Sequence, residues 1–83
     1  MDDEKAVVTF WIKKRNMCVD IEIPLEISGD ELVRALNTAY DLEIDVSDSG
    51  ACFLRSENPV ALIKGKRLLR DFGIRNGTMI SYI

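Results

Sequence analysis

The chain has 83 residues, of which 47% are hydrophobic and 30% are charged, and it carries a formal net charge of −3. This composition is ordinary for a globular protein and excludes a disordered chain. The length allows a single domain, residues 1–83, with one thin core, so a deep substrate pocket is not expected. The negative net charge argues against nucleic acid as the main partner.

The residue types that most catalytic and metal sites require are missing or isolated. There is no histidine, and Cys18 and Cys52 form no CxxC pair, so neither a zinc site nor a disulfide framework is predicted. No nucleophile stands beside a base, and no motif pairs two carboxylates. We therefore expect a protein that is not an enzyme, with no catalytic, metal-binding or cofactor-binding residues and no cofactor.

The beginning of the chain gives no targeting signal. Residues 1–5 are acidic where a secretory signal would be basic, and we expect them to be a frayed leader. The apolar run over residues 6–12 is far too short to cross a membrane. Because the two cysteines also fit a reducing compartment, the sequence predicts a cytoplasmic protein without membrane insertion.

Two strands are predicted in the first third of the chain. Residues 6–13 and 17–25 alternate in their apolar side chains, and the short break between them predicts an antiparallel hairpin. Core-facing side chains are expected at Val8, Phe10, Ile12, Val19, Ile21 and Ile23. The opposite face of the hairpin is expected to carry Val7, Thr9, Trp11, Cys18, Asp20 and Glu22.

Residues 27–42 predict a helix. Ser28 is a favoured N-cap, and Glu31 three residues later can complete a capping box. Apolar side chains then recur at helical spacing, at Leu32, Val33, Leu36, Ala39 and Tyr40. This stripe predicts that the helix packs across whatever sheet the remaining residues build.

The second half of the chain predicts short elements separated by turns. The expected elements are an acidic loop at 43–50, strands at 51–55 and 60–64 around a turn at 56–59, an irregular or 3₁₀ turn at 68–74, and a strand at 78–83. In the last strand, the alternation places Ile80 and Tyr82 on one face and Met79, Ser81 and Ile83 on the other. The predicted order is therefore β-β-α-β-β-β.

Two motifs late in the chain resemble those of a known superfamily. Residues 64–66 (KGK), followed by 69–74 (LRDFGI), resemble the ubiquitin-like pattern G-K-x-L and L-x-D-[YF]-x-I. The ending over residues 69–77 is most similar to the YukD/EsaB ubiquitin-like proteins of type VII (WXG100) secretion systems. The resemblance implies an α+β, β-grasp fold: a mixed sheet with one helix packed across one face.

The motif residues themselves have a structural interpretation. We expect Asp71 to cap the following turn, and Gly73 and Gly77 to adopt positive φ angles. The apolar residues of the same segment, Leu69, Phe72 and Ile74, are expected to fill one end of the core.

The resemblance also implies a function. It indicates a non-enzymatic interaction module, an accessory or regulatory component of a bacterial type VII secretion system. The expected partners are cytoplasmic parts of that machine, with the secretion ATPase as one candidate. Modifiers and sulfur carriers act through a C-terminal Gly-Gly, whereas this sequence ends at Ile83, so that role is not expected. A generic ubiquitin-like adaptor and a homodimeric structural protein remain as alternatives.

The face of the sheet away from the helix is the candidate protein-binding site. The alternation sends Trp11, Val7, Met79 and Ile83 to this face, and exposed tryptophans are enriched at interaction hot spots. The alternative is that Trp11 packs under neighbouring chain or lies flat on lysine stems.

A set of basic residues is the second candidate binding feature. Such a set suits an acidic partner or is simply a solvated face. Its members are Lys13, Lys14, Arg15, Lys64, Lys66, Arg67, Arg70 and Arg75. The stretch 64–67 contains a glycine but lacks the multi-glycine loop of a phosphate site, so it only weakly indicates phosphate binding.

Overall fold

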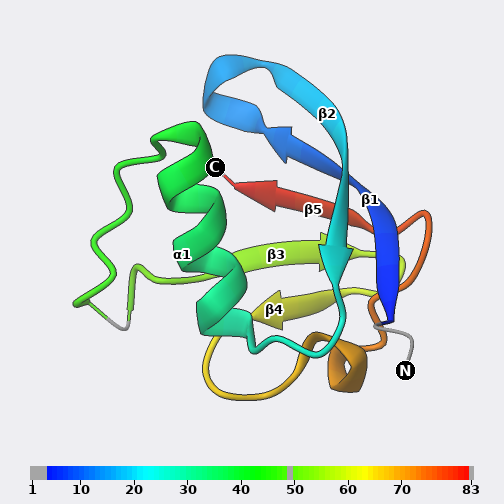
Figure 1. Cartoon of the computed structure of the whole chain (residues 1–83). Helices are drawn as coiled ribbons and strands as arrows, with labels where there is room; N and C mark the ends of the chain where they lie inside the picture. The colour runs from blue at the N-terminus through cyan, green and yellow to red at the C-terminus, as the bar shows by residue number, and fades with distance from the viewer. Residues whose placement is uncertain (1–3, 49, 83) are drawn as a thin grey trace.

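The computed structural model describes residues 4–48 and 50–82, and Figure 1 shows the path of the chain. Within these residues the sheet has five strands in the order β2-β1-β5-β3-β4, and α1 lies across one of its faces. The elements are β1 Lys5–Ile12, the 3₁₀ turn η1 Lys13–Arg15, β2 Met17–Pro24, α1 Gly29–Tyr40, β3 Leu54–Glu57, β4 Ala61–Ile63, the 3₁₀ turn η2 Leu69–Phe72, and β5 Met79–Tyr82. β1 and β5 are parallel and the other pairs are antiparallel, so the predicted mixed β-grasp sheet is confirmed.

The predicted hairpin is confirmed in its pairing and in its faces. β1 and β2 pair antiparallel from Lys5 opposite Pro24 to Ile12 opposite Met17. The core-facing side chains of β1 are almost fully buried, whereas those of β2, an edge strand, are buried only in part except Ile23. The largest fully buried side chains of the core are Phe10, Ile12, Leu32, Leu54, Ile63, Leu69 and Ile80.

The predicted capping box begins α1. The Ser28 hydroxyl accepts a hydrogen bond from the Glu31 N–H at 3.1 Å, and the Glu31 carboxylate accepts one from the Ser28 N–H at 3.0 Å. The stripe is confirmed except at Ala39, which is exposed. Ala39 is small and lies at the margin of the stripe in the last turn, where Tyr40 instead reaches the core and packs on Phe10 with ring centroids 5.3 Å apart.

The predicted boundaries of the third strand were wrong. Residues 51–53 are not in the strand, because the N–H groups of 51 and 52 bond to the Asp48 carbonyl in a turn. Ser56 and Glu57, predicted as turn, belong to β3 and pair with Ile80 and Met79 of β5. Ser56 tolerates this buried position because its hydroxyl donates to the Pro59 carbonyl at 2.8 Å.

The acidic loop also contributes to the core, which composition alone did not indicate. Ile44 is 7% exposed, and Leu42, which was predicted as the last residue of the helix but follows the end of α1 at Tyr40, is 3% exposed. Asn37 holds this loop against the helix, since its side-chain amide donates to the Ile44 carbonyl at 3.1 Å and accepts from the Ile44 N–H at 2.9 Å.

The 68–74 segment forms the predicted 3₁₀ turn. Gly73 and Gly77 have φ angles of 82° and 90°, the left-handed conformation predicted for them. Leu69 and Ile74 are buried and Phe72 packs against the core, also as predicted. The capping role predicted for Asp71 in the following turn was wrong: the N–H groups of Gly73 and Ile74 donate to the carbonyls of Arg70 and Leu69 instead.

Candidate protein-binding face

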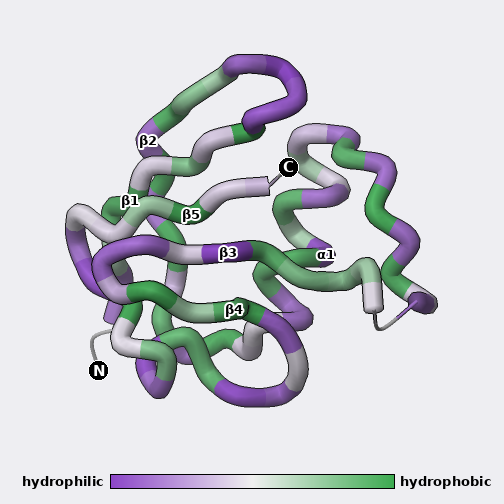
Figure 2. Tube along the Cα trace, turned by 180° about the vertical axis from the view of Figure 1, so that it is seen from behind, coloured by the Kyte–Doolittle hydropathy of each residue, from purple (hydrophilic) through white to green (hydrophobic). Residues whose placement is uncertain are grey.

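The sheet has one face under α1 and one face that no helix of the described chain covers. Figure 2 shows the molecule from that uncovered side, with a hydrophilic turn between β1 and β2 and a hydrophobic β4. We call this surface the open face. The strand registers assign to it Val7, Thr9, Trp11, Cys18, Asp20, Glu22, Arg55, Glu57, Leu62, Met79 and Ser81.

Trp11 lies near the middle of the open face. It is partly exposed, and it aligns with Cys18 on one side and Ser81 on the other. The Lys13 ammonium nitrogen lies 5.0 Å from the centroid of the Trp11 ring, within the range of a cation–π contact. Contact with a lysine, one of the two alternatives for Trp11, therefore occurs, but it leaves part of the ring accessible.

The other predicted residues lie on the same face where the structure describes them. Val7 is 47% exposed and Met79 is partly buried, while Ile83 lies outside the described residues. The prediction missed Leu62, which is 43% exposed on this face. Alternation within β4 carries that signal, because Ala61 and Ile63 face the core and Leu62 must face the other way.

A hollow interrupts the open face beside Trp11. Ser81 is small and stands between Trp11 and Arg55 in register, so the surface dips there. The hollow has a volume of about 330 Å³. Its lining includes Lys13, Arg55, Ser56, Glu57, Val60, Ala61, Leu62 and Ser81. It combines aliphatic walls with basic and acidic groups at its margin, which suits part of a protein surface better than a reaction centre.

Charge on the open face changes sign along β1. The acidic side chains lie toward the beginning of the strand: Glu22 is opposite Val7, Asp20 is opposite Thr9, and Glu57 is opposite Met79. The basic side chains lie toward its end, with Arg55 in the row of Trp11 through Ser81 and Lys13 directly after the strand. Lys5 is beyond the acidic group, at the first position of β1.

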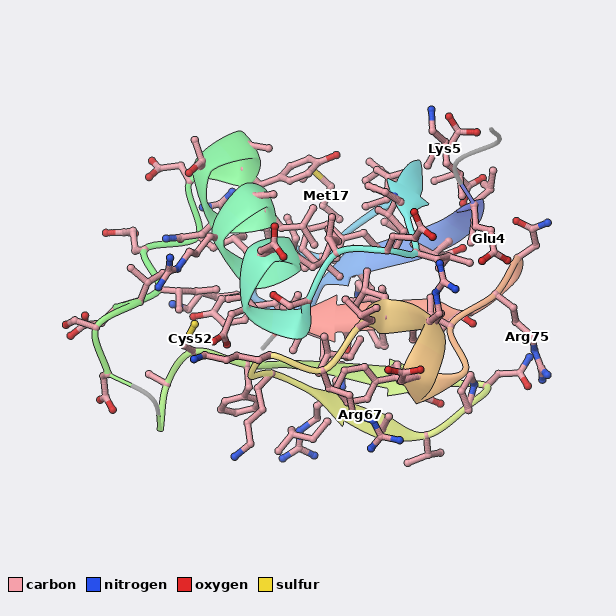
Figure 3. All side chains as sticks on the ribbon, turned by 60° about the horizontal axis from the view of Figure 1, so that its bottom comes forward. Glu4, Lys5, Met17, Cys52, Arg67 and Arg75 are labelled. Carbon is pink, nitrogen blue, oxygen red and sulfur yellow. The ribbon has the colours of Figure 1, made fainter. Side chains whose placement is uncertain are left out.

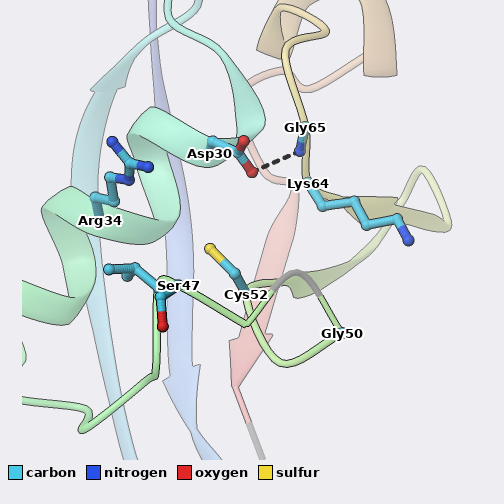
Figure 4. A pocket seen from close by; sticks show the side chains of 8 residues that line it. Asp30, Arg34, Ser47, Gly50, Cys52, Lys64 and Gly65 are labelled. Atoms are coloured by element: carbon cyan, nitrogen blue, oxygen red, sulfur yellow. Dashed lines mark hydrogen bonds between the residues drawn. The ribbon is translucent and has the colours of Figure 1, made fainter.

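A second hollow of about 400 Å³ lies on the helix side of the sheet, between α1 and the 46–52 loop (Figure 4). Its lining includes Asp30, Arg34, Cys52 and Lys64. Burial raises the pKa of the Cys52 thiol, and the nearby Asp30 carboxylate raises it further. A thiol with a raised pKa is a poor nucleophile at neutral pH, so this arrangement gives no activated cysteine.

The weak indication of phosphate binding at 64–67 finds no support in the geometry of this second hollow. The N–H of Gly65 already donates to the Asp30 carboxylate at 2.7 Å. The first N–H groups of α1 are also used, because those of Gly29 and Asp30 donate to the carbonyls of Arg67 and Gly65, each at 2.9 Å. The backbone donors that would bind an anion are therefore occupied.

The basic residues do not form a single patch. Arg15 donates to the carbonyls of Tyr40 and Asp41 at the C-terminus of α1. Arg70 bonds to the carboxylates of Glu4 and Glu26. Arg67 donates to the Asp71 carbonyl at 3.0 Å, and Arg75 donates to the Asn58 side chain at 3.2 Å; Figure 3 shows these two arginines apart from each other. Much of the predicted cluster thus has local structural partners.

Two further classes of site can be checked over the described ranges. Residues 4–48 and 50–82 contain no group of three or more histidine, cysteine or carboxylate residues placed to hold a metal ion. No helix in the same ranges is long and apolar enough to cross a membrane.

Comparison with known proteins identifies the fold. No protein-family model matches the chain, and no curated protein matches it. Among solved structures, the C-terminal ubiquitin-like domain of mouse tubulin-specific chaperone e has a TM-score of 0.71 at 11% identity, covering 98% of this chain and 87% of that one. The ubiquitin-like domain of tubulin-binding cofactor B has a TM-score of 0.68 at 17% identity, with 96% and 89% covered.

A third similar structure comes from a secretion system. The ubiquitin-like domain of the Mycobacterium tuberculosis type VII secretion system protein ECCD1 has a TM-score of 0.53 at 16% identity, covering 94% of this chain and 96% of that one. At these identities the likeness concerns the fold alone. The chain has the ubiquitin-like β-grasp fold.

Proposed function

We propose that the chain is a non-enzymatic interaction module that binds a protein partner through the open face around Trp11. The observation that carries the proposal is the partly exposed Trp11 ring on the same face as Val7, Met79 and Leu62, a face that no helix of the described chain covers. Tryptophan anchors flanked by aliphatic contacts are typical of the centre of a protein interface.

The partner that we propose is a cytoplasmic part of a type VII secretion machine, with its ATPase as one candidate. This more specific step is supported by the resemblance of residues 69–77 to YukD/EsaB-type proteins. The fold of the ECCD1 domain adds support, since that protein belongs to such a system. On this proposal the chain is an accessory or regulatory component that works in the cytoplasm.

A generic ubiquitin-like adaptor is the second candidate. It is favoured by the range of proteins that share the fold, which includes tubulin-specific chaperone e and tubulin-binding cofactor B. An adaptor of this kind would use the same open face but would recover no secretion components.

The experiment is a pull-down from detergent-solubilised native cells with tagged wild-type protein, Trp11→Ala and Val46→Ala. Val46 is a matched control, because it is also an exposed aliphatic residue but lies on the helix side, at the second hollow. We expect wild-type protein and Val46→Ala to recover secretion components and Trp11→Ala to lose them.

The other results separate the parts of the proposal. Recovery of the same secretion components by all three proteins would mean that the interface lies outside the open face. Recovery of unrelated proteins in a Trp11-dependent manner would favour the generic adaptor.

A further inference from the structure

The charges of the open face are self-complementary under a two-fold rotation. Acidic Glu22, Asp20 and Glu57 lie at one end of the face, and basic Arg55 and Lys13 lie at the other. The nearest opposite charges of the two groups, Glu57 and Arg55, are two residues apart on the same face of β3, about 7 Å along an extended strand, which is within the Debye length of about 8 Å at physiological ionic strength. The open face therefore has an acidic half, in the rows of Val7 and Thr9, that adjoins a basic half, which begins in the row of Trp11.

We propose that the open face binds a second copy of this chain, forming a two-fold symmetric dimer in which the acidic end of each copy meets the basic end of the other. In a two-fold interface the same surface is used by both partners. An axis parallel to the sheet and perpendicular to β1 exchanges the two ends of the face, so Arg55 and Lys13 of one copy meet the acidic group of the other. Each charged end then faces the end of opposite charge on the other copy.

The remaining groups of the face suit this arrangement. Met79 lies in the row of Glu57, and Trp11 and Leu62 lie in the row of Arg55. The rotation that exchanges the two rows would cover these apolar side chains with the open face of the second copy. In the described chain the ion pairs are those of Arg70 with Glu4 and Glu26, so the charges of the open face have no ionic partner within one copy. The hollow beside Ser81 leaves room for an aliphatic side chain from the facing surface.

This inference rests on the proposed function, which identifies the open face as the binding surface. It adds a way in which binding at that face is regulated. If the free protein covers Trp11 with a second copy, any other partner must displace that copy. Docking would then depend on protein concentration, and the dimer would keep an apolar face from non-specific contacts.

Sedimentation equilibrium of the purified chain tests the dimer without any other partner. We expect a concentration-dependent rise from the 9.4 kDa of one chain to twice that mass. The dimer should be weaker at about 1 M salt than at about 0.01 M, because screening removes the charge attraction between the ends.

Two charge-reversal variants make the test specific. Lys13→Glu/Arg55→Glu gives a face that is acidic at both ends, and Glu22→Lys/Glu57→Lys gives one that is basic at both ends. Each variant alone should associate at least about tenfold more weakly than wild type, since like charges then meet at both ends. An equimolar mixture should restore association, because each acidic end now meets a basic end. Circular dichroism of each variant checks that the fold is retained.

Several results would overturn the inference. A wild-type chain that stays at 9.4 kDa at all concentrations has no such dimer. Unchanged self-association of both variants would place the contact elsewhere, as would a mixture that stays monomeric although each variant is folded. If a variant does not fold, Leu62→Glu, at an exposed position of the same face, should abolish the dimer in its place. If the chain is monomeric but still recovers a partner that depends on Trp11, the dimer is wrong and the proposed function stands. If the chain dimerises but recovers no such partner, the proposed function is wrong and the dimer stands.

Discussion

Asp30 and Gly65 exchange two hydrogen bonds: the Gly65 N–H donates to the Asp30 carboxylate at 2.7 Å, and the Asp30 N–H donates to the Gly65 carbonyl at 2.9 Å. This pair ties the first turn of α1 to the segment after β4 (Figure 4). The carboxylate also lies where the helix dipole favours negative charge.

Replacement of Asp30 by alanine should therefore destabilise the fold. We expect the free energy of unfolding to fall by about 1–2 kcal/mol, from the lost hydrogen bond and the lost charge at the helix N-terminus. Urea denaturation measures the change. Asp71→Ala is the control, since Asp71 is exposed and the N–H groups of Gly73 and Ile74 after it bond to other carbonyls, and it should change stability by less than about 0.5 kcal/mol.

Gly29→Ala should lower the free energy of unfolding, whereas the same change at an ordinary helix position raises it. Alanine normally gains about 1 kcal/mol over glycine within a helix. A Cβ atom at Gly29 would lie 2.7 Å from the Lys64 N and 2.8 Å from its O, a backbone that cannot move aside cheaply. We expect a loss of about 1–3 kcal/mol in the free energy of unfolding, as for other overpacked sites.

The exposed Ala35 of the same helix provides the reference for this change. Ala35→Gly should lose about 1 kcal/mol by propensity alone. A stabilised Gly29→Ala protein would contradict the close approach of α1 to residue 64.

Asn37→Ala should release the loop that follows α1. The two hydrogen bonds to Ile44 hold a backbone whose side chain is buried in the core, so their loss should cost about 1–3 kcal/mol. Hydrogen exchange is expected to accelerate at the Ile44 amide and in the neighbouring loop. The exposed neighbour Thr38, replaced by alanine, should leave this exchange unchanged.

The two cysteines should react differently with a thiol reagent. Cys18 is exposed, whereas burial, with Asp30 nearby, raises the pKa of the Cys52 thiol. Since the thiolate is the reactive form, we expect rapid labelling of Cys18 and slow labelling of Cys52 at about pH 8, with both labelled in denaturant.

The pH dependence of this behaviour has a defined sign. The rate at Cys52 should rise as the pH increases through its raised pKa. The unfolded chain releases this proton at lower pH than the folded chain, so ionisation of Cys52 should destabilise the fold as the pH rises above the ordinary thiol pKa. Equal labelling rates for the two cysteines in the folded protein would contradict the buried position.

The sequence predicted the elements whose signals are local. The capping box of Ser28 and Glu31 and the alternation of β1 and β2 needed no distant partner to be recognised. The end of β3 could not be placed in this way, because Ser56 belongs to a strand only through its pairing with Ile80 and its bond to Pro59.

The candidate site was predictable to a similar extent. Alternation placed Trp11, Val7 and Met79 on the open face correctly. The hollow and the change of charge along β1 depend on how β5 and β3 align with β1, which places Ser81 beside Trp11 and Arg55. No local sequence pattern contains that register.

Photo-crosslinking in native cells tests most directly whether the open face is the surface at which this protein binds other molecules. A photoreactive amino acid would replace Leu62, exposed on the open face, or Thr38, exposed on α1. We predict discrete crosslinked products from position 62, at twice the 9.4 kDa chain mass for a second copy or at a larger mass for another partner, and none from position 38. Products from position 38 with none from position 62 would contradict the assignment of the open face as the binding surface.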